Sequence, residues 1–146
     1  MPEEIAVRVI GKVENRVKEP LGQEAFSGEI SVITVYPEYA AGLYRIEENE
    51  YLDILFHFHL AGGFSLHTKV FSGEEKGVFA SRSPHRPSGI GLTTVRLEKR
   101  VGNRLLVRGL DAVDGTPVLD IKPSVSHFTD EEKAIISGRE GDAMKR

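Results

Sequence analysis

Hydrophobic and polar residues alternate along most of this chain, and residues 51–60 show the pattern most clearly. In that segment every even-numbered residue is large and apolar, whereas the other face carries Asp53, His57 and His59. A period of two predicts a strand with one face in a core. Similar runs predict further strands at residues 5–10, 30–36, 66–71, 77–80, 92–97, 105–110 and 118–121.

About eight short strands within one domain predict a mainly β fold. A small antiparallel or mixed β-barrel is preferred to a sandwich because closure removes exposed edges. Gly102 and its neighbours suit a hairpin turn, and a short helical turn is expected at residues 37–43. One more short helix is expected with Thr129 as N-cap and Glu132 completing a capping box. Residues 1–137 are the expected barrel domain, and residues 138–146 a flexible tail.

Composition excludes several classes of chemistry. The chain has no cysteine, so disulfides, a thiolate nucleophile and a cysteine-based zinc site are excluded. No apolar run approaches the roughly 18 residues of a membrane helix, and the acidic start of the chain does not resemble a signal peptide. We therefore expect a cytoplasmic protein with no membrane partner. No Gly-x-Gly-x-x-Gly or Walker loop is present to indicate a nucleotide-binding βαβ domain.

Positive charge is concentrated in residues 80–110, which carry seven Lys or Arg and one acid, Glu98, in a chain of net charge −3. Such a segment can attract an anionic partner, or it can be a solvated strand face. Its first part, residues 82–91, contains two prolines and two glycines, which exclude regular structure and would hold Arg82 and Arg86 on a restricted turn. Those arginines suit a carboxylate or phosphate, although a plain surface connection remains open.

Two other groups of polar residues have alternative interpretations. His57 and His59 share a strand face that His67 could approach, but His-x-His is a weak metal signal, and hydrogen-bonded histidines are the simpler reading. We therefore expect no metal site. Asp111 and Asp114 lie in a segment that fits an Asx-type turn, although their carboxylates could equally hold a ribose, an ammonium or the arginines.

The motifs at residues 77–92 and 109–123, in this order, closely resemble those of the TsaA-like family. Residues 10–13 and 39–43 also resemble the family's N-terminal half, so the similarity covers residues 5–123. The resemblance implies a homodimeric β-barrel enzyme that binds S-adenosylmethionine near the subunit interface. It implies N6-methylation of threonylcarbamoyl-adenosine immediately 3′ of the anticodon in tRNA.

The resemblance also assigns roles to residues. Asp114, with Asp111 second, is the expected proton acceptor, because an exocyclic adenine nitrogen is a poor nucleophile. The expected cofactor-binding residues are Pro20, Leu21, Gly22, His59, Leu60, Arg82, Leu92, Val113, Asp114, Gly115 and Thr116. The expected tRNA-binding residues are His85, Arg86, Ser88, Arg96 and Lys122.

The chain departs from the family pattern at two places. Ser88-Gly89 replaces the usual Asn-Pro, which removes an amide side chain and loosens one turn, and Ser124 replaces a tyrosine. Two other functions remain open. A non-catalytic RNA- or nucleotide-binding barrel would use the same arginines, with Phe64, Phe71 and Phe79 stacking on bases. A metal-dependent hydrolase would use His57, His59 and Asp53 and is the weaker alternative.

Overall fold

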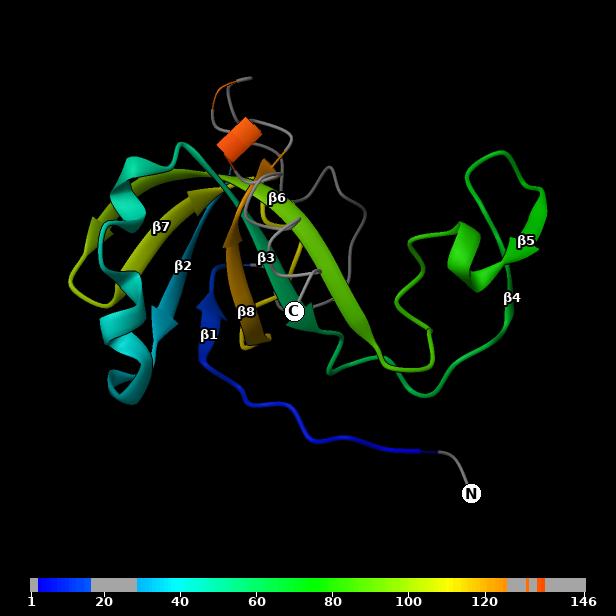
Figure 1. Cartoon of the computed structure of the whole chain (residues 1–146). Coiled ribbons are helices and arrows are strands. Elements are labelled where there is room, and N and C mark those ends of the chain that lie inside the picture. The colour runs from blue at the N-terminus through cyan, green and yellow to red at the C-terminus, as the bar shows by residue number, and fades with distance from the viewer. Residues whose placement is uncertain (1–2, 17–28, 126–130, 132–133, 136–146) are drawn as a thin grey trace.

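The computed structural model describes residues 3–16, 29–125, 131, 134 and 135. Eight strands lie within them: β1 (Gly11–Glu14), β2 (Ile30–Val35), β3 (Tyr51–His57), β4 (His67–Lys69), β5 (Glu75–Gly77), β6 (Ile90–Val101), β7 (Arg104–Arg108) and β8 (Pro117–Pro123). Six of them close an antiparallel barrel in the order β1-β2-β7-β6-β3-β8, and β8 pairs with β1 (Figure 1). The expected β-barrel is confirmed.

The alternation in β3 builds the barrel interior. Leu52, Ile54 and Phe56 are buried, and β3 is paired on both sides, with β6 and β8. Matching inward positions on the other strands complete a single core, which also contains Val13, Ile33, Val35, Val95, Leu105, Val107 and Val118. Because successive side chains point to opposite faces, the outward positions of these strands are left for charged residues.

The hairpin predicted around Gly102 joins β6 to β7. Gly102 has φ +61°, a left-handed conformation that glycine adopts without a Cβ penalty. Asn103 then ties the turn to β2, because its side-chain amide donates to the carbonyl of Val35 at 2.7 Å. The turn therefore fixes the register of three neighbouring strands.

Two predicted strands are wrong. Residues 5–10 are not a strand, and β1 begins at Gly11, directly after the predicted strand. Ile5 and Val7 are 90% and 59% exposed, and of the apolar residues in this segment Ile10 alone packs against the described core. Gly11 is the first residue of β1. The neighbouring strand β2 lies so close to it that a Cβ on Gly11 would be 2.3 Å from the carbonyl oxygen of Thr34.

The second wrong strand is at residues 77–80, where only the first residue belongs to β5. Val78–Ala80 forms the 3-10 helix η4, closed by a bond from the amide of Ser81 to the carbonyl of Val78 at 3.1 Å. Val78 is buried whereas Phe79 is exposed, and three residues are too few to distinguish this turn from a strand by pattern alone.

Residues 58–89 leave the barrel between β3 and β6 and are here called the arm. Figure 1 shows the arm (green) extending to one side of the barrel, with β4 and β5 paired as a separate two-stranded sheet. His67 of β4 and Glu75 of β5 are joined through Nδ1 and Oε1 at 3.0 Å. Within the arm, all of which the structure describes, Val78 is the sole buried side chain.

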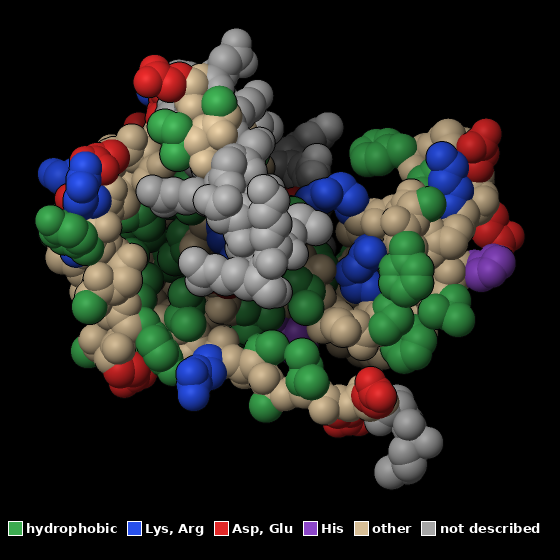
Figure 2. Space-filling view, viewed as in Figure 1, with side chains coloured by type: hydrophobic (Ala, Val, Ile, Leu, Met, Phe, Trp, Pro, Cys, Tyr) green, Lys and Arg blue, Asp and Glu red, His purple; other side chains and the backbone are tan. Residues whose placement is uncertain are grey.

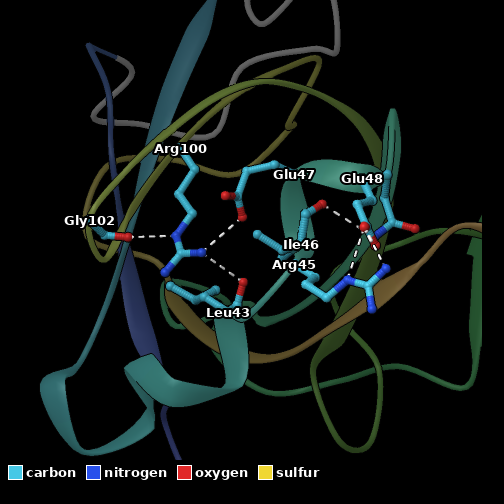
Figure 3. Close-up of polar contacts among 8 residues, drawn as sticks. Leu43, Arg45, Ile46, Glu47, Glu48, Arg100 and Gly102 are labelled. Carbon is cyan, nitrogen blue, oxygen red and sulfur yellow. Dashed lines mark hydrogen bonds and ion pairs between the residues drawn. The ribbon is translucent and has the colours of Figure 1, made fainter.

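The helical turn predicted at residues 37–43 is confirmed as the 3-10 helix η2 (Pro37–Leu43), followed by η3 (Ile46–Glu48). Arg100 of β6 holds both in place (Figure 3). Its Nη1 donates to the carbonyl of Leu43 at 3.0 Å and to Oε1 of Glu47 at 2.8 Å, and its Nε donates to the carbonyl of Gly102 at 2.8 Å. One side chain thus links η2, η3 and the hairpin turn.

The C-terminal part of the chain is described only in part. Thr129, Glu132 and the tail at 138–146 lie outside the described residues, whereas Glu131, Ala134 and Ile135 are helical as expected. Over the part that the structure describes, no helix has the length and apolar character needed to span a membrane.

Candidate functional site

A cavity of about 820 Å³ lies where β3 and β6 leave the barrel and enter the arm. Figure 2 shows a hollow between barrel and arm, with Lys and Arg side chains (blue) at its edge. The two sequence blocks that carried the family resemblance meet here. Residues 80–86 and 90–93 line the cavity, and so do residues 111–113 together with Thr116.

Asp111 is the one acid among the described residues that line the cavity. Its Oδ1 accepts a hydrogen bond from the hydroxyl of Thr93, which projects from β6. Both residues line the cavity and both are partly buried. The carboxylate is therefore held in a defined position at the barrel wall.

The turn after Asp111 forms the next part of that wall. Thr116 is buried, and its hydroxyl donates to the carbonyl of Val113 at 2.7 Å. Gly115, at φ +83°, donates its amide to the carbonyl of Val13 at 2.7 Å. The turn is thus fixed to β1, with Val113 and Thr116 lining the cavity.

Aromatic rings form the floor where β3 ends. The rings of Phe56 and Phe58 meet edge to face, with centroids 5.2 Å apart and planes at 77°. Both rings pack against Gly91 of β6. A Cβ on Gly91 would lie 2.5 Å from the Phe56 ring and 2.8 Å from the Phe58 ring. The glycine is required because these rings occupy the space above the strand.

The loop at residues 82–91 is held by its own arginines. Arg82 donates from Nη2 to the carbonyl of Leu92, and both residues line the cavity. Arg86 donates from Nη1 to the carbonyls of Ser81 at 3.0 Å and Ser83 at 3.1 Å. Both arginines thus help to shape the loop, and both line the cavity.

The remaining expected residues are divided between the cavity and other places. His59, Leu60 and His85 line it. Pro20, Leu21 and Gly22 lie outside the described residues. The rest are not among its lining residues: Ser88, Arg96, Asp114, Gly115 and Lys122.

The positions away from the cavity have local partners. The main-chain amide of Asn15 donates to Oδ1 of Asp114 at 3.0 Å, so this aspartate joins the turn to the end of β1. Lys122 lies 2.8 Å from Oδ2 of Asp120, and this hydrogen bond, with the carboxylate's charge, raises the pKa of Lys122. Arg96 lies 3.8 Å from a carboxylate oxygen of Glu50.

The predicted positive charge of residues 80–110 is partly neutralised, on the barrel strands. Four of its arginines pair with glutamates, some of them from distant parts of the chain: Arg96 with Glu50 and Glu98, Arg100 with Glu47, Arg104 with Glu14, and Arg108 with Glu98. A count along one segment cannot detect such pairs, because the neutralising charges stand on neighbouring elements. The barrel strands therefore fit the solvated-face interpretation better.

The histidines considered as metal ligands do not form a metal site with the acids near them in the described part of the chain. Among the described residues no three His, Asp or Glu side chains gather as a possible metal site. Asp53 accepts a hydrogen bond from the hydroxyl of Thr94 at 2.6 Å, and His67 is joined to Glu75 in the arm.

Many residues of the cavity lining were not among the predicted site residues, and three of them bear on the site. Thr93, Gly91 and Lys69 all line the cavity. Gly91 carried a usable signal, because a glycine inside an apolar strand marks a close approach. Thr93 and Lys69 lie in ordinary strand patterns, where nothing distinguishes them from solvated positions.

The family model for the N-terminal domain of tRNA-methyltransferase O matches residues 11–130. This chain belongs to the tRNA-methyltransferase O family. Over 99% of its length it is 40% identical to a probable S-adenosyl-L-methionine-binding protein of Pyrococcus abyssi, of which it covers 82%. It is 45% identical over 96 residues, or 63% of its length, to a mouse tRNA (adenine(37)-N6)-methyltransferase.

Solved structures of the tRNA-methyltransferase O family share the barrel. A crystal structure of TrmO from Pseudomonas aeruginosa aligns with a TM-score of 0.68 at 33% identity, covering 88% of this chain. This chain spans 59% of that TrmO chain and 22% of the mouse enzyme.

Proposed function

We propose that this chain is an S-adenosylmethionine-dependent tRNA methyltransferase that acts on N6 of the adenosine immediately 3′ of the anticodon. The observation that carries the proposal is the single cavity lined by both characteristic sequence blocks, with Asp111 in its wall. The names of the relatives from Pyrococcus abyssi and mouse, one a binder of the cofactor and one a tRNA adenine methyltransferase, support it. Threonylcarbamoyl-adenosine is the proposed acceptor, from the resemblance of the motifs.

The cavity fits this cofactor. Its volume of about 820 Å³ lies within the range of about 300–1,000 Å³ usual for small-molecule sites. Phe58 and Leu92 supply apolar surface for an adenine ring, while Arg82 supplies a guanidinium that suits a carboxylate. Val113 and Thr116 would complete the binding wall, with His59 and Leu60 at the rim.

When bound, S-adenosylmethionine supplies a methyl group activated by its sulfonium. The residues of this chain must orient the acceptor adenine and accept the proton that its exocyclic nitrogen loses. We assign the role of proton acceptor to Asp111 rather than Asp114, because Asp111 lines the cavity and is oriented by Thr93. Asp114 would then act by holding the turn through Asn15.

We also propose that the protein is a homodimer that works in the cytoplasm, where its tRNA substrate is found. The arm exposes large apolar side chains and buries one, so its surface favours a protein partner. The exposed residues are Leu60, Phe64, Leu66, Phe71 and Phe79. Leu60 and Phe71 also line the cavity, so an interface covering the arm would stand close to the cofactor.

Calorimetric titration with S-adenosylmethionine tests the proposal. We expect micromolar binding to the wild-type protein and loss of that binding in Arg82→Ala, because the guanidinium is part of the cavity wall. Arg104→Ala is the matched control, since Arg104 pairs with Glu14 and is absent from the cavity lining. A wild-type protein that binds no S-adenosylmethionine would contradict the proposed function, whereas binding without methyl transfer would favour a non-catalytic binding barrel.

A further inference from the structure

We propose that Lys69 of β4 binds a backbone phosphate of the tRNA beside the nucleotide that is methylated. The tRNA then reaches the mouth of the cavity beside Lys69, in place of the barrel strands that carry Arg96 and Lys122. This inference rests on the proposed function, because it assigns part of the same cavity to the nucleic acid.

The charges around the cavity differ from those on the barrel. Among the described residues, Lys69, Arg82 and Arg86 line the cavity together with one acid, Asp111, whereas the net charge of the chain is −3. The barrel arginines are paired with glutamates, and Lys122 is paired with Asp120. A polyanion is therefore attracted to the mouth of the cavity more than to the barrel wall.

Lys69 differs from the two arginines in its surroundings. Arg82 and Arg86 each donate to backbone carbonyls of the loop or of β6. Among the described residues, no hydrogen bond or ion pair engages the Lys69 ammonium. Glu75 stands directly across from Lys69 in the hairpin, but its carboxylate is joined to His67 at 3.0 Å. The ammonium is exposed and keeps its donors for a ligand.

The charge of the cofactor decides between the two possible ligands. S-adenosylmethionine carries a sulfonium and an ammonium against one carboxylate, so it has a net positive charge. A lysine without a partner repels such a molecule overall and attracts a phosphate diester. Because methyl transfer requires both molecules in one cavity, Lys69 marks the part that the nucleic acid occupies.

The experiment measures the affinity for a transcribed tRNA that carries adenosine 3′ of its anticodon, at several salt concentrations, beside the affinity for S-adenosylmethionine. For Lys69→Ala we expect tRNA binding to weaken about three- to tenfold and the slope of log affinity against log salt to fall by about 1. Affinity for S-adenosylmethionine should not weaken. Lys69→Arg should restore tRNA binding, because it keeps the positive charge.

Two variants of β5 complete the design. Lys76→Ala is the matched control, because Lys76 is an exposed lysine on the neighbouring strand that does not line the cavity. It should leave both affinities unchanged. Glu75→Gln should strengthen tRNA binding about twofold, since it removes the acid nearest to Lys69 along the hairpin.

Unchanged tRNA binding in Lys69→Ala would overturn the inference, and so would an equal loss in Lys76→Ala or a loss of cofactor affinity in Lys69→Ala. Each result leaves the proposed function intact if the wild-type protein still binds S-adenosylmethionine and methylates tRNA. Failure of the wild-type protein to do either would instead count against the proposed function itself.

Discussion

Gly91 is the glycine of the cavity lining that leaves no room for a Cβ. A methyl group there would lie 2.5 Å from the buried Phe56 ring, so the ring or the strand must shift. We expect Gly91→Ala to lower the free energy of unfolding by about 1–3 kcal/mol and to weaken cofactor binding, since Phe58 lines the cavity.

Urea denaturation measures that loss. Gly62→Ala is the control, because a Cβ at Gly62 meets nothing within 4 Å, and its stability should stay close to that of the wild-type protein. Equal stability of the two variants would show that the Phe56 and Phe58 rings do not pack against Gly91.

Asp111 and Asp114 should differ in catalysis. Asp111→Asn keeps the shape of the side chain but removes the proton acceptor, so we expect single-turnover methyl transfer to slow by about 10²- to 10⁴-fold. Asp114→Asn should slow it far less, because Asp114 accepts a bond from the Asn15 amide and does not line the cavity. The opposite order of rates would return the catalytic role to Asp114.

The sequence motifs identified the segments that build the cavity better than the role of each residue. The segments that contain Arg82, Leu92 and Val113 line one cavity, and their roles in it stay predictions. Position within a motif favours Asp114 over Asp111 as the proton acceptor, but it does not show in which direction a side chain of the turn points. Nothing in the sequence marked Lys69 as a site residue, because its ammonium is left for a ligand only when the Glu75 carboxylate is joined to His67.

At the scale of elements, the contact between Arg100 and Glu47 makes η3 sensitive to acid. The hydrogen bond from Arg100 lowers the pKa of the Glu47 carboxyl from its ordinary value of 4.5. The folded protein therefore binds this proton less readily than the unfolded chain, so the contribution of Glu47 to stability is present above pH 4.5 and is lost as pH falls through its folded pKa.

Denaturation of the wild-type protein and Glu47→Gln across this pH range tests the contact. We expect the wild-type protein to be the more stable above pH 4.5, and the difference to shrink as Glu47 becomes protonated. A difference that stays constant with pH would show that the Glu47 charge does not contribute.

Hydrophobic alternation predicted a strand correctly where the segment is paired with a strand on each side. β3 is paired on each side and its alternation matches a buried and a solvated face. Residues 5–10 have an equally good alternation, but in the described part of the chain only Ile10 bonds to the barrel, through Val118 and Tyr36, and Ile5 remains 90% exposed. A period of two reports the shape that a segment can take, not whether another strand lies beside it.

For the whole molecule, the exposed apolar surface of the arm predicts a homodimer. Light scattering should give twice the chain mass of 16.1 kDa for the wild-type protein. Phe71→Ser with Phe79→Ser should shift it toward the monomer, since these side chains are 109% and 78% exposed. Tyr44→Ser, which changes an exposed residue between η2 and η3, should remain dimeric. A wild-type monomer would contradict the prediction.

Transfer of labelled methyl groups from S-adenosylmethionine to tRNA tests the central claim most directly. The assay would compare tRNA that carries threonylcarbamoyl-adenosine beside the anticodon with the unmodified transcript, followed by mass spectrometry of the nucleosides. We predict label on N6 of that adenosine in the modified tRNA, and its loss in Asp111→Asn. Absence of label from both tRNAs, with a protein that binds the cofactor, would contradict the account.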